Sequence, residues 1–222
     1  MSKKTASFAL AAALAAVSAI SPAYANDNAL DGFYGRLDTG GSFGESTKLT
    51  YTNGASSTSD VGNAAIIGGG LGYYLSDHFR TDLTFGYRTG YQITGTYGKA
   101  DASSFDTLVN GYYDFDSYGA VKPYIGFGIG LASNDVGTTT AISGAPVSIN
   151  SNSQTSFAWQ AGAGATIALA DRWALDVGYR YFDGGDAKTG DTLTVGTATY
   201  SGATIKGHLD ANEIQAGLRY SF

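Results

Sequence analysis

Residues 211–222 read ANEIQAGLRYSF and decide the fold class of this chain. From Ile214 to Phe222 an apolar side chain occupies every second position, and polar or small residues lie between them. A period of two is that of a β-strand with one apolar and one polar face. Chain ends are usually polar and frayed unless other elements hold them. The apolar end at Phe222 therefore predicts a final strand that is paired within the fold.

The same alternation recurs along the chain before this stretch. It is clear over residues 79–88, 125–131, 159–169 and 173–181, and weaker over 33–43, 64–75 and 105–115. With the final segment this gives eight strands, an even number that suits closure into an up-and-down barrel. The 32 glycines, about twice the usual share, also lower the odds of long helices.

The connections between these segments alternate in size. Short ones lie at 76–78, 116–122 and 170–172, and long ones rich in Ser, Thr, Gly, Asn and Asp lie at 44–63, 89–104, 133–155 and 183–208. Short turns at one rim and long loops at the other are typical of outer-membrane barrels. The sequence predicts an all-β fold: an eight-stranded antiparallel up-and-down transmembrane β-barrel with short periplasmic turns and four long extracellular loops.

The first 25 residues have the features of an export signal. Lys3 and Lys4 precede an apolar stretch over residues 8–20, and an A-x-A site follows at residues 23–25. We therefore expect residues 1–25 to be a cleaved signal peptide and residues 26–222 to form one outer-membrane β-barrel domain. There is no cysteine, so neither a disulfide nor a lipid-attachment thiol is expected. A net charge of −6 argues against a nucleic-acid partner.

The polar face of the predicted strands carries eleven charged residues in mid-strand positions. They are Arg36, Asp38, Arg80, Asp82, Arg88, Asp106, Asp114, Asp176, Arg180, Glu213 and Arg219. Glycines are interleaved with them, as a narrow barrel interior requires when long side chains share it. Five arginines against six acids favour a salt-bridged plug in the lumen, because buried charges must be paired. A proton path or a selectivity constriction is the alternative interpretation.

Aromatic residues gather near the predicted strand ends in two groups. Phe33, Phe79, Phe115, Trp173, Tyr220 and Phe222 lie toward the short turns, and Phe43, Tyr91, Phe105, Trp159 and Tyr181 lie toward the long loops. Such pairs of aromatic girdles mark the two interfaces of a membrane barrel.

Four stretches, DGFYGRLDTG (31–40), KPYIGFGIGLA (122–132), WALDVGYRYFD (173–183) and the C-terminal ANEIQAGLRYSF, resemble the small outer-membrane barrel family of Gram-negative bacteria. That family includes the opacity-type proteins, alphaproteobacterial surface antigens and the transmembrane barrel of outer membrane protein A. The resemblance implies a monomer with both termini in the periplasm, surrounded by outer-membrane lipid and lipopolysaccharide. It also implies that the last strand is read by the outer-membrane assembly machinery, with Ile214, Leu218, Tyr220 and Phe222 as the assembly signal.

The motifs that could carry chemistry are weak. His78 lies in a short turn and His208 near the last strand, and neither has a partner for nucleophilic catalysis in the sequence pattern. The stretch DGGDAKTGD (183–191) does not have the spacing of a calcium-binding EF-hand loop, and no helix follows GFGIG (126–130). We therefore expect no enzyme activity, no metal and no cofactor.

The composition and the resemblance together predict a structural, surface-exposed integral protein of the outer membrane. It would serve envelope integrity, loop display, adhesion or surface antigenicity, and a host or surface ligand could bind its loops. A narrow porin-like channel for small solutes is one alternative. Loop-mediated binding of heme or another small ligand, with Tyr51 and His208 as candidate contacts, is another. Whether the charged lumen leaves a water path distinguishes the channel from the structural barrel.

Overall fold

The structure, a computed structural model, describes residues 32–95 and 98–222. The expected signal peptide lies outside the described residues. Eight long strands form the wall: β1 (Phe33–Gly44), β4 (Asn63–Tyr74), β5 (Phe79–Thr94), β6 (Gly98–Asp114), β7 (Val121–Val136), β10 (Asn152–Ala170), β11 (Trp173–Lys188) and β14 (Ile205–Ser221). Six short strands complete the described elements: β2 (Thr47–Tyr51), β3 (Ser56–Val61), β8 (Thr139–Ala141), β9 (Val147–Ile149), β12 (Thr192–Val195) and β13 (Ala198–Ser201). Within the described ranges, no helix is long and apolar enough to cross a membrane.

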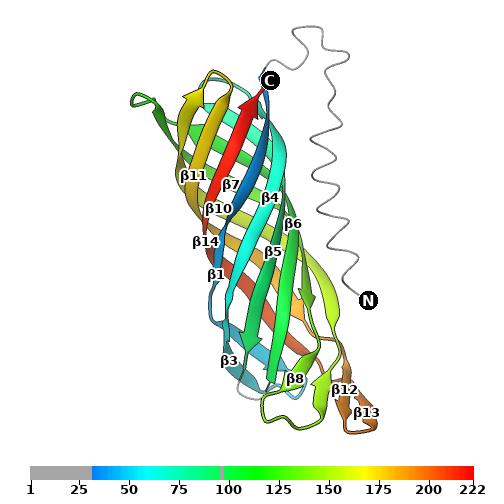
Figure 1. Ribbon diagram of the computed structural model, residues 1–222. Helices are drawn as coiled ribbons and strands as arrows, with labels where there is room; N and C mark the ends of the chain where they lie inside the picture. The colour runs from blue at the N-terminus through cyan, green and yellow to red at the C-terminus, as the bar shows by residue number, and fades with distance from the viewer. Residues whose placement is uncertain (1–31, 96–97) are drawn as a thin grey trace.

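The eight long strands close into a ring. Each pairs antiparallel with its neighbour along the chain, and β1 pairs with β14 from Tyr34↔Ser221 to Gly44↔Ala211. The last strand is thus held on both sides, by β1 and by β11. In Figure 1 the tilted strands form a long cylinder, with the C-terminus at one end and β3, β8, β12 and β13 at the other. The predicted eight-stranded antiparallel barrel is confirmed.

The four long connections contain far more strand than the sequence pattern indicates. The wall strands β5, β6, β7, β10, β11 and β14 run well into the segments expected to be loops, and β2 and β3 form a hairpin within residues 44–63. β8 pairs with β6, and β9 pairs with both β8 and β12, so two of these connections pair with each other and extend the sheet of the wall. Small residues such as Ala100 and Ala102 line the inner face here, and their low hydrophobicity makes the alternation hard to detect.

The apolar face of the wall points outward along the middle of the barrel. Phe127 is 54% exposed, Leu131 57% and Ile214 59%, whereas the charged residues of the intervening positions are buried. A soluble protein would bury the first set and expose the second. This arrangement matches the lipid-facing band of a membrane barrel.

Tyr91 is an exception to the predicted aromatic girdle. Its side chain is fully buried in the lumen, where it packs with Val61, Ala64 and Leu209. The register of β5 against β6 shifts between Thr89 and Tyr91, and the intervening glycine has a φ of 105°. Such a bulge adds one residue to the strand and reverses which face the following side chains occupy. The assignment of Tyr91 to the outer surface was therefore wrong.

Candidate functional site

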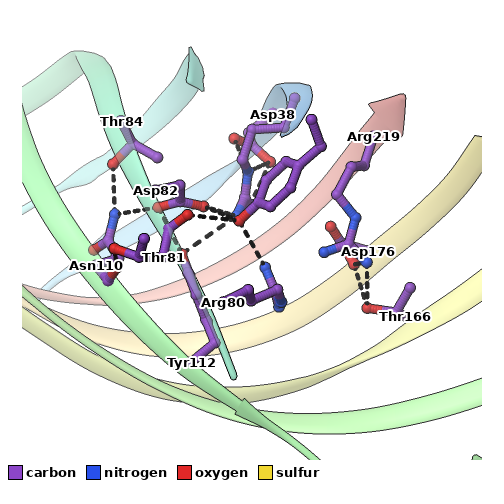
Figure 2. A network of polar contacts seen from close by, with 12 residues as sticks. Asp38, Arg80, Thr81, Asp82, Thr84, Asn110, Tyr112, Thr166, Asp176 and Arg219 are labelled. Atoms are coloured by element: carbon purple, nitrogen blue, oxygen red, sulfur yellow. Dashed lines mark hydrogen bonds and ion pairs between the residues drawn. The ribbon is translucent and has the colours of Figure 1, made fainter. Parts of the chain in front are cut away.

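The structure brings all eleven charged residues predicted for the lumen into ion pairs with one another. Toward the short turns, Arg80 Nε lies 3.1 Å from Asp114 Oδ2, and Arg219 Nη2 lies 3.3 Å from Asp176 Oδ1. Thr166 Oγ1 donates a hydrogen bond to Asp176 at 2.6 Å and accepts one from Arg219 at 3.0 Å. Figure 2 shows Arg80 and the contacts among Thr166, Asp176 and Arg219 from close by.

A second group of paired charges is centred on Arg36 and Asp82. Arg36 contacts both Asp38, at 2.7 Å, and Asp82, at 3.0 Å. The amide of Asn110 donates hydrogen bonds to Asp82 at 2.7 Å and to Thr84 at 2.9 Å. Figure 2 shows the Asp82 carboxylate beside Asn110, which also reaches Thr84. Strands β1, β5 and β6 are thereby linked through their side chains as well as through the sheet.

The third group spans the lumen. Glu213 of β14 is buried and accepts hydrogen bonds from Arg88 Nε at 2.5 Å and from Arg180 Nε at 2.6 Å. Arg88 Nη1 also pairs with Asp106. The Arg88 guanidinium lies 3.5 Å from the ring centroid of Phe182, within cation–π range. Because Arg88 lies on β5, with β4 and β1 between it and β14, this bridge crosses the interior of the ring.

Three tyrosines that point into the lumen complete the charged network, and the sequence analysis did not single them out. The Tyr34 hydroxyl lies 3.1 Å from Asp82 Oδ2, and Arg80 packs 3.9 Å from the Tyr112 ring centroid and 4.8 Å from that of Tyr124. Their positions along the strands could have revealed them. Tyr34 and Tyr112 are separated from inward charged residues on their own strands by an even number of positions, so they face the same side. Tyr124 has the same relation to the inward glycines that follow it.

Glycines provide the space for these long side chains. A Cβ added at residue 72 would overlap the Tyr34 ring, and one added at residue 128 would overlap the Asn110 amide. The interior of an eight-stranded barrel is just wide enough to be filled by side chains. A cavity of about 40 Å³ remains beside Arg36, Asp176 and Arg180. About 10–15 Å³ of such space is enough for one water molecule, so this cavity has room for at least one.

Both histidines lie outside the lumen network. On the outer wall, His208 Nε2 lies 3.0 Å from Asp183 and Nδ1 lies 3.2 Å from Asp186. Partial burial lowers the pKa of His208, but the hydrogen bonds and charges of these carboxylates outweigh it and raise the pKa above its usual value. His78 Nδ1 lies 2.9 Å from the Asp114 carbonyl oxygen. In the described part of the chain, no serine hydroxyl bonds to either imidazole ring.

The acidic stretch at residues 183–191, which lacks the spacing of a calcium-binding loop, forms the bulged end of β11 and the turn after it, and Gly185 has a φ of 73° there. Over residues 32–95 and 98–222, no three His, Asp or Glu side chains are grouped as metal ligands.

The four residues of the expected assembly signal lie on the outer face of β14 or directly after it. Ile214 and Leu218 are exposed toward the lipid side. Tyr220 packs against Trp173, with ring centroids 4.8 Å apart, and against Phe222 at 5.5 Å. Their recognition by an assembly machinery stays a prediction.

The closed ring, the outward apolar band and the paired lumen charges together define a small outer-membrane β-barrel. A family model for the outer membrane protein beta-barrel domain matches residues 9–222, and the chain belongs to this family. It is an integral, surface-exposed protein of the outer membrane.

Three relatives illustrate its sequence neighbourhood. An uncharacterized protein of Rickettsia conorii is 25% identical over 202 residues, which cover 85% of this chain and 86% of that protein. A Rickettsia rickettsii protein named "Putative adhesin" is also 25% identical, covering 85% and 87%. Outer membrane protein PagN of Salmonella typhimurium is 34% identical over 122 residues, covering 52% of this chain and 48% of PagN.

Solved structures show the same fold. Neisserial surface protein A has a TM-score of 0.51 at 22% identity, covering 86% of this chain and 98% of that one. OprG of Pseudomonas aeruginosa has a TM-score of 0.61 at 15% identity, covering 86% and 96%. The outer membrane protease OmpT of Escherichia coli has a TM-score of 0.51 at 12% identity, covering 87% and 98%. At these identities the likeness concerns the fold alone.

Proposed function

We propose that this protein is a closed, non-catalytic barrel that displays its extracellular hairpins as an adhesive surface. The observation that carries the proposal is the bridge from Arg88 through Glu213 to Arg180, which joins opposite walls of the ring with buried, paired charges. Paired charges of both signs fill the lumen, whereas an ion filter presents a ring of one sign. The barrel then acts as a rigid scaffold, and the extracellular hairpins carry the function.

The extracellular hairpins offer contacts suited to a protein partner. Tyr200 is 57% exposed, Ile142 51% and Val195 41%, and all three lie in or beside the short strands outside the wall. Tyrosine is enriched in protein interfaces because it combines an apolar ring with a hydroxyl group. The adhesin name of the Rickettsia rickettsii relative supports the same role.

Adhesion is tested by expressing the full chain in a non-adherent bacterial host and counting the bacteria bound to cultured cells. We expect the wild type to confer binding and the double variant V195S/Y200S to lose most of it. Tyr118→Ser is the matched control, because Tyr118 is 77% exposed in a short turn at the opposite end. Equal binding by cells with and without the protein would refute the adhesive role.

Closure is tested by single-channel recording of the refolded protein in a planar bilayer. We expect no conductance from the wild type and at most brief, irregular openings from Arg80→Ala and Asp176→Ala. Each of these substitutions removes one partner of an ion pair near the short turns. Steady, saturable conductance from the wild type would refute the plug and favour the channel alternative.

Absence of catalysis is part of the proposal. It is supported by the environments of the two imidazole rings: His208 lies between Asp183 and Asp186, and His78 faces a backbone carbonyl. Hydrolysis of lipid or peptide substrates by the refolded barrel, lost in His208→Gln, would contradict it.

We also propose that the barrel is a monomer in lipopolysaccharide-containing membrane and that the outer face of β14 is its assembly signal. The outward positions of Ile214, Leu218 and Tyr220 support recognition of this strand before the ring closes. Phe222→Ala should lower the amount inserted in cells while leaving refolding in detergent unchanged. A parallel loss in detergent would indicate a folding defect in place of a recognition defect.

A further inference from the structure

The extracellular half of the lumen contains a cavity that the charged network does not reach. Its volume is about 220 Å³, and it is partly open to solvent. Inward side chains of the wall and the short hairpins line it, among them Leu49, Val61, Val136, Ile149 and Leu193. Three of these five, Leu49, Val61 and Val136, are less than 9% exposed. The lining is thus an apolar interior and differs from an open groove on the surface.

Small inward residues explain why space remains at this level. Toward the extracellular end β2 and β3 replace β1 and β4 between β14 and β5, so the ring keeps its number of strands and its diameter changes little. Within the membrane, arginine, tyrosine and glutamate side chains fill the lumen. At the extracellular end the lining includes Gly95, Gly98, Ala100, Ala102 and Gly207. Side chains this short do not reach the centre. The cavity therefore follows from the sequence of these strand extensions.

The lining favours a neutral ligand. Asp135, Lys188 and His208 border the cavity, but all three are exposed to solvent, and both ring nitrogens of His208 already face carboxylates. Burying an ion among apolar side chains without a partner is unfavourable. An apolar cavity of about 150 Å³ in a protein core takes up benzene, so this larger one accommodates a molecule of one or two rings.

Two buried hydroxyl groups at this site lack partners in the described part of the chain. They are Thr139 Oγ1, on a residue that lines the cavity, and Ser59 Oγ. A Cβ built on Gly95 would lie 2.9 Å from Ser59 Oγ and 3.5 Å from Leu49 Cδ1, so this hydroxyl lies beside the lining. Buried hydroxyls normally form hydrogen bonds. A ligand with one polar group placed against the Thr139 side chain would satisfy that hydroxyl.

We propose that this cavity binds a small, neutral, largely apolar molecule that carries one hydroxyl or carbonyl group. The site adjoins an open polar pocket of about 700 Å³, since Tyr51, Lys188 and Thr189 line both spaces. This pocket faces the outside of the cell, and the paired charges separate the cavity from the periplasmic end. The site retains its ligand at the cell surface and does not conduct it across the membrane.

The probe for this site is 1-naphthol, with naphthalene as its analogue without a hydroxyl. Backbone amide shifts of the refolded barrel in lipid nanodiscs are followed as each compound is added. We expect saturable shifts at Ala100, Val136 and Leu193, and only linear changes at lipid-facing Leu83, where the compounds partition into the bilayer. Linear changes at all four positions would mean membrane partitioning alone and would overturn the proposal.

Two variants assign the binding to this cavity. Ala100→Phe places a ring in the cavity and should abolish the saturable shifts, whereas Leu83→Phe, on the lipid face, should leave them unchanged. Thr139→Val keeps the side-chain size but removes the hydroxyl, and it should weaken 1-naphthol about threefold to tenfold without affecting naphthalene. Thr138→Val, at an exposed neighbouring position, is its control. Unchanged 1-naphthol affinity in both cavity variants would refute the site, and the Thr139 arm remains decisive if Ala100→Phe does not fold.

Discussion

The membrane half and the extracellular half of the barrel have opposite polarity, and β14 contains both. Nearer the C-terminus, the lipid-facing positions are Ile214 and Leu218 and the lumen positions are Glu213 and Arg219. Toward the start of the strand the polarity is reversed: the outward face is polar and the inward face is apolar. The outward positions become Asp210, His208 and Lys206, and the inward ones become Ala211, Leu209 and Ile205.

This exchange shows that the surroundings of the wall set the chemistry of the lumen. In the bilayer the outer face must be apolar, so the alternating strand places its polar side chains inside, where they need partners. Above the bilayer the outer face meets water, and the lumen is built like the core of a soluble barrel. One half is therefore stabilised by ion pairs and filled except for a cavity of about 40 Å³, and the other half is apolar and retains a cavity of about 220 Å³.

The largest expected effect tests the charged half. Glu213→Gln removes the carboxylate that pairs with both Arg88 and Arg180 and leaves Arg180 without its ion-pair partner in the lumen. Breaking a buried pair by removing one partner costs about 3–5 kcal/mol. The free energy of unfolding in lipid vesicles, measured by urea titration with tryptophan fluorescence, should fall by this amount.

The control for this variant is Glu45→Gln. The Glu45 carboxylate is exposed on the outer wall and accepts a hydrogen bond from Asn212 at 2.5 Å. Substitution there should change the free energy of unfolding by about 0.5 kcal/mol or less. Equal losses in the two variants would mean that the lumen network does not stabilise the barrel more than a surface contact does.

The next effect tests how completely the charged half is filled. Gly128→Val places a branched side chain against the amide of Asn110, and overpacking of this kind costs about 1–3 kcal/mol. Gly111→Val is the matched control, because a Cβ at residue 111 meets nothing within 4 Å. Valine there also suits a strand, so stability should be unchanged or slightly higher. A Gly128→Val barrel as stable as the wild type would show that this lumen has room to spare.

The same kind of enlargement should have the opposite sign in the extracellular half. Ala100 lines the apolar cavity, so Ala100→Leu should raise the free energy of unfolding by about 0.5–2 kcal/mol, as cavity filling commonly does. Ala132→Leu is the comparison within the filled region, because Ala132 packs fully buried against Leu108, Ala158 and Phe182. It should cost about 1–3 kcal/mol. A loss of stability in both variants would contradict the difference between the two halves.

The sequence was sufficient for the membrane half because alternation there is strong. It predicted eight strands, and the eleven charged residues that it assigned to the lumen form ion pairs with one another in the structure. It could not predict which charges pair: Arg88 and Glu213 are 125 residues apart, and their meeting depends on the closure and stagger of the whole ring. Pairing at such separations follows from strand register, which short-range patterns do not contain.

Two features made the strands and inward residues of the extracellular half difficult to predict from the sequence. The bulge at Gly90 reverses the faces of β5, so Tyr91 was assigned to the outer girdle although its hydroxyl bonds to Ser42 in the lumen, with the two oxygens 2.5 Å apart. Beyond the membrane several inward residues, such as Ala100 and Ala102, are small, and the segments have the composition of loops even though they form strands. Polarity alone therefore does not separate a solvated strand from a loop.

The smallest expected effect lies on the outer wall of the extracellular half, where His208 contacts Asp183 and Asp186. Because its pKa is raised above the usual 6.5, the folded barrel binds the proton more tightly than the unfolded chain. The resulting stabilisation is complete below the unfolded pKa and is lost as the pH rises through the folded pKa. Half-exposed ion pairs contribute about 0.2–1 kcal/mol.

His208→Gln should therefore lower the free energy of unfolding by a few tenths of a kcal/mol near pH 5, and the difference from the wild type should shrink toward zero near pH 9. The measurement is the urea titration repeated across this range. In a background of Asp183→Asn and Asp186→Asn the substitution should have no pH-dependent effect, because the groups that raise the pKa are gone. A difference that grows with pH would have the wrong sign and would show that His208 is neutral in the folded barrel.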